Sequence, residues 1–155
     1  MAYDAAADAL VWGRRDSLGP TFRIWRYDMR TGAWGQGAPS SSPYLFFGYG
    51  PLGAEITFDE DLGRIVIVAH GTVVSLNGST GAWEALRLGP GTADPVTRLD
   101  QAAIFDPVNH RYVVLGGSRL FGGPIGWAKT DDVIAFDPST RSWLELLRGV
   151  SVQSS

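Results

Sequence analysis

AAIFDPVNHRYVVLGG, residues 102–117, predicts a β-hairpin: a short strand that ends in Phe105-Asp106, a turn, and an apolar strand that ends in Gly116-Gly117. The same unit occurs twice earlier in the chain. Its copies are Tyr3-Asp4 followed by Leu10-Val11-Trp12-Gly13, and Phe58-Asp59 followed by Ile65-Val66-Ile67-Val68. The chain therefore begins each of three repeats with a hairpin of the same kind.

A second pattern follows each hairpin, namely a strand that ends in Asp or Asn with a Trp six positions later. Its copies are Trp25-Arg26-Tyr27-Asp28 to Trp34, Val74-Ser75-Leu76-Asn77 to Trp83, and Ile134-Ala135-Phe136-Asp137 to Trp143. The first Asp recurs after 55 and then 47 residues, and the Trp after 49 and then 60. The mean period of ~50 residues is typical of blade-like β repeats.

The composition agrees with an all-β chain and excludes several partners. Twenty Gly and nine Pro separate short β-branched and aromatic runs, and no helical apolar period persists. Thirteen Lys plus Arg against sixteen Asp plus Glu give a net charge of −3, so no basic field favours nucleic acid. Apolar runs such as 65–69 are far shorter than the ~20 residues of a membrane helix. We expect neither nucleic acid nor a membrane as partner.

The Gly116-Gly117 strand end, the Tyr/Phe-Asp pair of the third strand and the spaced Trp residues make the chain resemble the kelch-repeat β-propeller family. The resemblance covers roughly residues 2–148, although the Gly doublet is intact only in the third unit. It implies three four-stranded antiparallel blades at about 2–36, 54–88 and 102–148, joined by inter-blade loops 37–53 and 89–101. The expected strands are 2–4, 9–13, 23–28, 33–36, 55–59, 64–69, 72–77, 82–88, 102–106, 111–116, 132–137 and 142–147.

Residues that recur in every unit are interpreted as structural, because packing is needed in each repeat and a single active site is not. An Asp at a strand end accepts hydrogen bonds from backbone N–H groups that have left the ladder. Such turn residues are expected at Asp4, Asp59, Asp106, Asp28, Asn77 and Asp137. Trp34, Trp83 and Trp143 open the outer strands, where a large ring fills the wedge between neighbouring sheets.

Binding residues are sought in what does not repeat. The resemblance implies that the strand 2 to 3 loops, at 14–22, 70–72 and 117–131, open on the same face as the inter-blade segments, and such loops often carry function. The ligand-binding candidates there are Arg14, Arg15, His70, Arg98, Arg119, Trp127, Lys129, Tyr44, Phe47 and Tyr49. A basic and aromatic rim suits an anionic or carbohydrate ligand, or an acidic peptide.

Two alternatives remain open for this rim. Asp16, Asp94, Asp100, Asp131 and Asp132 lie in the same segments and could neutralise the cations as ordinary ion pairs. The aromatic residues of the segment 40–50, which include Tyr44, Phe46, Phe47 and Tyr49, either cap a central channel or meet a partner.

The catalytic residues, if the chain has any, are unknown. His70 could act as an acid, base or ligand, whereas His110 lies in a turn on the opposite side. The kelch family includes galactose-oxidase-like copper enzymes, whose radical cofactor requires a Cys–Tyr crosslink and two His ligands. The chain has no Cys, which also excludes disulfides, so we expect neither that copper site nor any other cofactor or metal.

The resemblance thus predicts a kelch-type binding module that holds a protein segment or glycan. The alternative is a sugar enzyme of the family, such as an epimerase. Three blades fall short of the roughly four to eight of closed propellers. We expect either half of a six-bladed ring, completed by self-association of two chains, or a segment whose remaining blades belong to a longer protein. No targeting signal is seen, which favours the cytoplasm by default, or secretion for a fragment.

Overall fold

The computed structural model describes residues 1–5, 7–15, 21–36, 40–41, 55–69, 71–77, 82–87, 98–121 and 126–148. For residues 14–15, 21–23, 40–41, 99, 119–121 and 126–127 it describes the backbone alone. These residues form strands and turns, and no helix that could cross a membrane lies in the described part of the chain.

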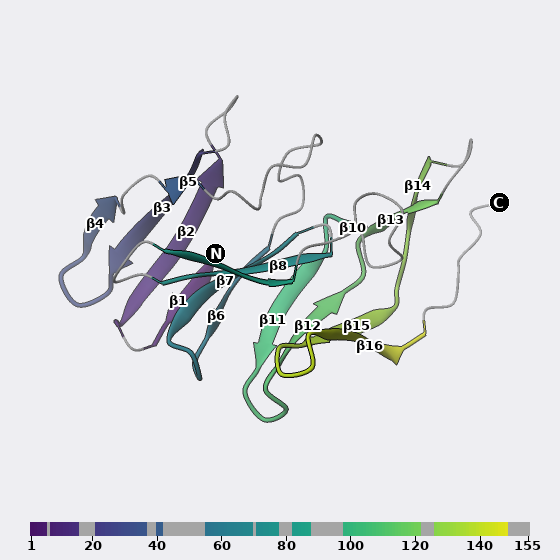
Figure 1. Ribbon diagram of the computed structural model, residues 1–155. Helices are drawn as coiled ribbons and strands as arrows, with labels where there is room; N and C mark the ends of the chain where they lie inside the picture. Colours follow the sequence, from purple (N-terminus) through teal and green to yellow (C-terminus); the bar gives the residue numbers. More distant parts are fainter. Residues whose placement is uncertain are drawn as a thin grey trace.

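Three antiparallel sheets with a common four-strand order lie in a row, in the order of the sequence (Figure 1). The first sheet has the order β1 (Ala2–Asp4), β2 (Ala9–Arg15), β3 (Thr21–Asp28) and β4 (Ala33–Gln36), with β5 (Ser40–Ser41) paired to β3. The middle sheet consists of β6 (Glu55–Asp59), β7 (Arg64–Ala69), β8 (Thr72–Leu76) and β9 (Trp83–Arg87). The third sheet consists of β11 (Ala102–Asp106), β12 (Arg111–Leu115), β15 (Val133–Asp137) and β16 (Ser142–Leu147).

The expected all-β class and the twelve strands of these sheets are confirmed, with bounds that differ by at most two residues. The first strands of the sheets are the ones that meet, since β1 packs against β6 and β6 against β11. The described residues form a row of three sheets and not a closed ring.

The expected turn role of the recurring Asp residues is confirmed where the structure describes it. Asp59 Oδ1 accepts the N–H of Leu62 at 2.9 Å, and Asp28 Oδ1 accepts the N–H of Thr31 at the same distance. Equivalent bonds are made by Asp4 to Ala7, by Asp106 to Val108 and Asn109, and by Asp137 to Ser139 and Thr140. These carboxylates satisfy N–H groups that the ladder leaves free.

Each of these turns also ends in the left-handed backbone region. In the first turns, the residue four positions after the Asp is Asp8, Gly63 or His110, with φ of 47°, 60° and 52°. In the second turns it is Gly32 or Arg141, with φ of 69° and 54°. A side chain is disfavoured in this region, so the hairpin geometry, and not the residue type alone, sets the backbone here.

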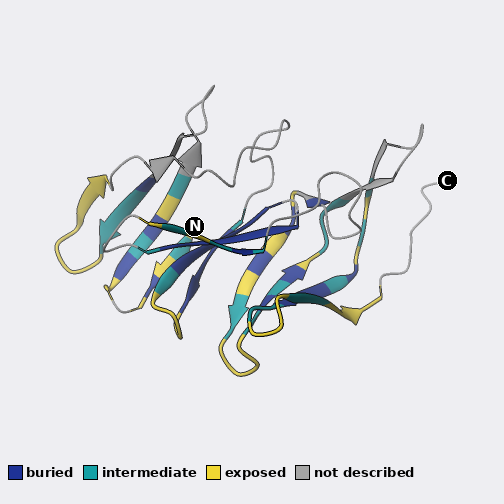
Figure 2. Ribbon diagram, viewed as in Figure 1, coloured by how far each residue is buried: buried dark blue, intermediate teal, exposed yellow. Residues whose placement is uncertain are grey.

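The middle sheet is covered on both faces, which explains its uninterrupted apolar strands (Figure 2). Ile65 and Ile67 of β7 pack toward the first sheet, in a cluster with Val11. Val66 and Val68, the alternate residues, belong to the cluster shared with the third sheet. Because successive strand residues face opposite sides, a strand between two sheets must be apolar at every position.

Parts of three expected loops form strands. β5 lies in the expected loop 37–53, and Arg98–Leu99 of the expected loop 89–101 also form a strand. The sequence predicts a loop over 117–131, but these residues contain β13 (Ser118–Phe121) and β14 (Gly126–Lys129), which pair with each other. Together with β10 (Arg98–Leu99) they form a small sheet of order β10-β13-β14. Gly116 and Gly117 both have positive φ, so the chain bends between β12 and β13, and the β12–β15 hairpin continues as a second hairpin in a new direction.

Candidate functional site

The strand order places the connections between sheets at one end of the sheets, which we call the loop end. In the first sheet, β2 ends and β3 begins at the loop end, where Arg15 pairs with Phe22. β4 runs antiparallel to β3 and also ends there, and β6 begins there at Glu55. The hairpin turns that begin at the recurring Asp residues lie at the opposite end, the turn end. The small sheet extends the third sheet at the loop end.

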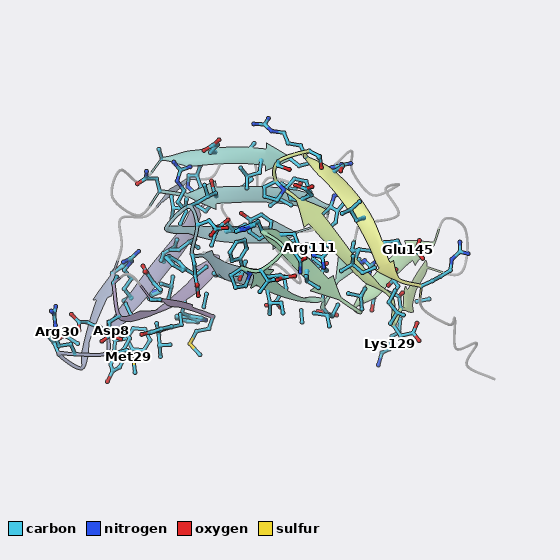
Figure 3. The ribbon with its side chains drawn as sticks, turned by 90° about the horizontal axis from the view of Figure 1, so that it is seen from below. Asp8, Met29, Arg30, Arg111, Lys129 and Glu145 are labelled. Atoms are coloured by element: carbon cyan, nitrogen blue, oxygen red, sulfur yellow. The ribbon has the colours of Figure 1, made fainter. Side chains whose placement is uncertain are left out.

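The small sheet brings several of the predicted rim residues together. Arg98 pairs with Arg119 in the register of β10 and β13, and Trp127 and Lys129 lie on β14. The Lys129 side chain is exposed and points away from the ribbon (Figure 3). Arg14 and Arg15 lie at the loop end of β2. For Arg14, Arg15, Arg119 and Trp127 the structure describes the backbone alone, and His70, Tyr44, Phe47 and Tyr49 lie outside the described residues.

Arg98 is not a surface residue. Its side chain is 1% exposed and forms a two-pronged ion pair with Asp132, with Nη1 at 2.5 Å from Oδ1 and Nη2 at 2.6 Å from Oδ2. Nη1 also donates to the carbonyl of Gly116 at 3.1 Å, and the Thr130 hydroxyl donates to the Asp132 carboxylate. The guanidinium thus joins β10 to the bend after β12 and to the segment between β14 and β15, and Asp132 neutralises it.

For Arg98, this ion pair has the form expected of the neutralising alternative, with Asp132 as the partner. Its buried guanidinium holds segments of the chain together. Sequence reasoning could not distinguish it from the other Arg residues because its burial depends on β10, a strand of two residues. Lys129 differs, since its side chain is exposed.

Gln101 forms a second buried polar contact near the same end. Its Nε2 donates to the carbonyl of Val68 in the middle sheet at 3.1 Å. Phe105, on β11, which begins at the residue after Gln101, donates its N–H to the hydroxyl of Thr57 at 3.0 Å. These two bonds join β11 and the residue before it to the middle sheet, and fix the third sheet against it.

At the turn end, two acidic residues of the middle sheet receive side chains of the third sheet. The buried hydroxyl of Tyr112 donates to Asp59 Oδ2, and burial together with this carboxylate raises the pKa of Tyr112 above its ordinary value of 10.0. His110 Nδ1 lies 2.5 Å from Asp61 Oδ2, and this hydrogen bond raises the pKa of His110 above 6.5. Both contacts fasten the two sheets to one another.

One of these turn-end contacts is open to solvent and the other is buried. His110 and Asp61 are exposed side chains at the surface of two turns, whereas Tyr112 is fully buried. Sequence reasoning placed His110 in a turn and did not foresee Asp61 as its partner. The two residues are 49 positions apart, about one repeat, which is the spacing that brings equivalent turns of adjacent sheets side by side.

Comparison with known proteins gives a likeness of fold only. No family model matches the chain, and no curated protein matches it. Among solved structures, a fungal alcohol oxidase of the AA5 family, in complex with copper, superimposes with a TM-score of 0.54 over 92% of this chain at 18% identity. The match covers 29% of the oxidase chain. The tricorn protease matches with a TM-score of 0.45, at 14% identity over 88% of this chain and 11% of its own.

The likeness to the oxidase supports the arrangement of three antiparallel sheets in sequence. At 18% identity it shows the fold and says nothing of activity. The chain spans about 29% of the length of that protein.

Proposed function

We propose that the chain is a run of three kelch-type propeller blades that acts as a binding module and holds its ligand, a protein segment or a glycan with anionic groups, at the loop end. Support for the blade assignment comes from the repeat of about 50 residues and from the common order of the three sheets. The packing of β1 against β6 and of β6 against β11 is also what blades around a common axis require.

The observation that carries the binding proposal is the small sheet at the loop end. It extends the third sheet beyond the length of the other two, and Trp127 and the exposed Lys129 occupy alternate positions of β14, which belong to one face. Arg119 pairs with Ala128, so its position belongs to the other face of the small sheet. Arg14 and Arg15 end β2 at the same end of the first sheet. Cationic and aromatic residues at one end of the sheets suit a ligand that offers carboxylates or sulfates together with a flat apolar surface. Arg98 takes no part, because Asp132 holds it.

The copper of the oxidase is not carried over to this chain. Among the described residues there is no group of three His, Cys, Asp or Glu side chains that could hold a metal ion, and the sequence has no Cys and two His. The donor set of the described part therefore does not fit a copper centre, and the proposed binding uses side chains alone.

The test is binding of two fluorescent probes, a poly-glutamate peptide and a sulfated oligosaccharide, measured by anisotropy at low and high salt. We expect at least one probe to bind, and Lys129→Glu to weaken it about two- to fivefold, the size of an exposed charge contact. Reversal of Arg14, Arg15, Arg119 and Lys129 together should abolish the binding. The matched control is Arg30→Glu, another exposed cation, at the turn end (Figure 3).

Two results would contradict the proposal. One is that neither probe binds at low salt. The other is that Arg30→Glu weakens the binding as much as Lys129→Glu, since this would mean that net charge and not the loop end attracts the probe.

A further inference from the structure

One row of side chains recurs at the same register in all three sheets. It runs across the four strands, and we call it the bulky row. Its members are Tyr3, Leu10, Tyr27 and Trp34 in the first sheet, Phe58, Ile65, Leu76 and Trp83 in the middle sheet, and Phe105, Tyr112, Phe136 and Trp143 in the third. Residues directly opposite one another on antiparallel strands share a face, so each row lies on one face of its sheet.

The opposite face of each sheet carries smaller residues one position away, which we call the receiving row. Its members are Ala2, Val11, Arg26 and Gly35 in the first sheet, Thr57, Val66, Ser75 and Glu84 in the middle sheet, and Ile104, Val113, Ala135 and Leu144 in the third. Each sheet thus has a bulky face and a receiving face.

Inside the chain, bulky faces pack on receiving faces twice. The bulky residues Phe58, Ile65 and Leu76 of the middle sheet are buried in one cluster with Val11 of the first sheet. The bulky residues Tyr112 and Phe136 of the third sheet are buried in one cluster with residues of the middle sheet's receiving face. Both interfaces have the same direction along the row of sheets, because the bulky face of the later sheet covers the receiving face of the earlier one.

At the two ends of the row of sheets, half of such an interface is exposed. On the first sheet, Tyr3 is 51% and Trp34 58% exposed, and Trp12 beside them is also exposed. On the third sheet, Ile104 is 55% and Leu144 43% exposed, with Leu115 and Leu147 exposed on the same face. These end faces are of the kind that the chain covers elsewhere, and large exposed apolar patches mark interaction surfaces.

We propose that the exposed bulky face of the first sheet docks onto the exposed receiving face of the third sheet of a second copy of this chain, head to tail. The argument is continuity with the two interfaces already formed: the receiving face of the third sheet lacks a bulky row, and another copy presents one at the same register. Two copies that dock at both ends bring together six sheets, within the roughly four to eight of closed propellers. All four end faces are then covered, and the assembly stops growing.

The proposed interface between copies lacks a hydrogen bond that the interface between the middle and third sheets has. In the internal contact, Phe105 N–H donates to the Thr57 hydroxyl. Tyr3 stands at the position of Phe105 on the first sheet, and Ile104 at the position of Thr57 on the third. Ile104 has no acceptor, so the affinity of the two copies rests on apolar burial, and we expect association to persist at high salt.

The experiment is the solution mass of the purified chain over a range of concentrations, by light scattering and sedimentation velocity. We expect twice the mass of one chain. Trp34→Glu and Ile104→Glu, each placing a charge on one end face, should each give a single chain. Both side chains are exposed in one copy, so circular dichroism should show unchanged folding. Val108→Glu, a substitution of an exposed apolar residue in a turn, is the matched control and should leave the mass doubled.

Mixing the two variants tests whether the docking is head to tail, with a bulky face on a receiving face. A copy with Trp34→Glu keeps an intact receiving face, and a copy with Ile104→Glu keeps an intact bulky face, so an equimolar mixture should restore the doubled mass through one wild-type contact. Three results overturn the proposal. The first is a single-chain mass for the unaltered chain at every concentration. The second is a Trp34→Glu variant that dissociates while the Ile104→Glu variant does not. The third is aggregation that neither substitution prevents, which would assign these faces to further sheets of a longer polypeptide.

Discussion

The ion pair between Arg98 and Asp132 makes a quantitative prediction for stability. Its geometry is two-pronged, at 2.5 and 2.6 Å, and the Arg98 side chain is 1% exposed. Removing one partner of a buried pair costs about 3–5 kcal/mol, because the other charge stays buried without compensation. Asp132 keeps the hydrogen bond from Thr130. We therefore expect Arg98→Met to cost about 3 kcal/mol, at the lower end of that range.

Equilibrium unfolding in urea, followed by circular dichroism, measures this loss as a shift of the midpoint at constant slope. For a chain of this length, about 3 kcal/mol also lowers the melting temperature by roughly 6–12 °C. The matched control is Arg30→Met, which removes an exposed cation whose partner Asp28 lies 3.8 Å away at the surface. An exposed pair of this kind contributes little, so the midpoint of the control should not move.

A double-mutant cycle separates the pair from other effects of the substitutions. Asp132→Asn should also destabilise, and the variant with both changes should lose less than the sum of the single losses, by about 1–3 kcal/mol. The reasoning is refuted if Arg98→Met unfolds at the same urea concentration as the Arg30→Met control, or if the two single losses simply add.

Further predictions concern the turn end and can be checked by the same unfolding measurements. Tyr112→Phe should cost about 1.5–3 kcal/mol, the loss of a buried hydrogen bond to the Asp59 carboxylate; a cost near zero would mean that the hydroxyl is solvated. Arg141→Gly should stabilise by about 0.5–1 kcal/mol, because its φ of 54° suits Gly; destabilisation would contradict this. Asp61 raises the pKa of folded His110 above 6.5, so their pairing stabilises fully below that value and is lost as the pH rises through the folded pKa. The melting temperature should fall over this window, and His110→Gln should abolish that part of the fall.

The three sheets could be predicted from the sequence because their information is local and repeated. An Asp at the end of a strand accepts the N–H groups of the next turn, and the same geometry returns after about 50 residues. The left-handed turn positions were less evident. Gly63 signals such a position by its residue type, whereas Asp8 and His110 occupy it only because the hairpin requires it.

The sequence predicts where the loop end lies, but it does not predict the small sheet there or the burial of Arg98. The small sheet has no counterpart in the other repeats, so the period that located the twelve strands of the three sheets gave no guidance there. The burial of Arg98 depends on an acceptor 34 residues away, Asp132, and on the bend at Gly116 and Gly117. A contact of that kind follows from tertiary packing, which charge and residue type do not encode.

The bulky row shows what a repeat encodes. Trp34, Trp83 and Trp143 occupy one register and follow the same spacing in the sequence. Trp83 and Trp143 pack against the core clusters on either side of the middle sheet, as a wedge-filling role requires, while Trp34 is exposed. The sequence specifies a side chain that is suited to being covered, and the neighbouring sheet decides whether it is. An exposed member of a repeat that is buried elsewhere therefore points to a neighbour of the same kind, and Trp34 and Ile104 mark the two end faces that the proposed second copy would cover.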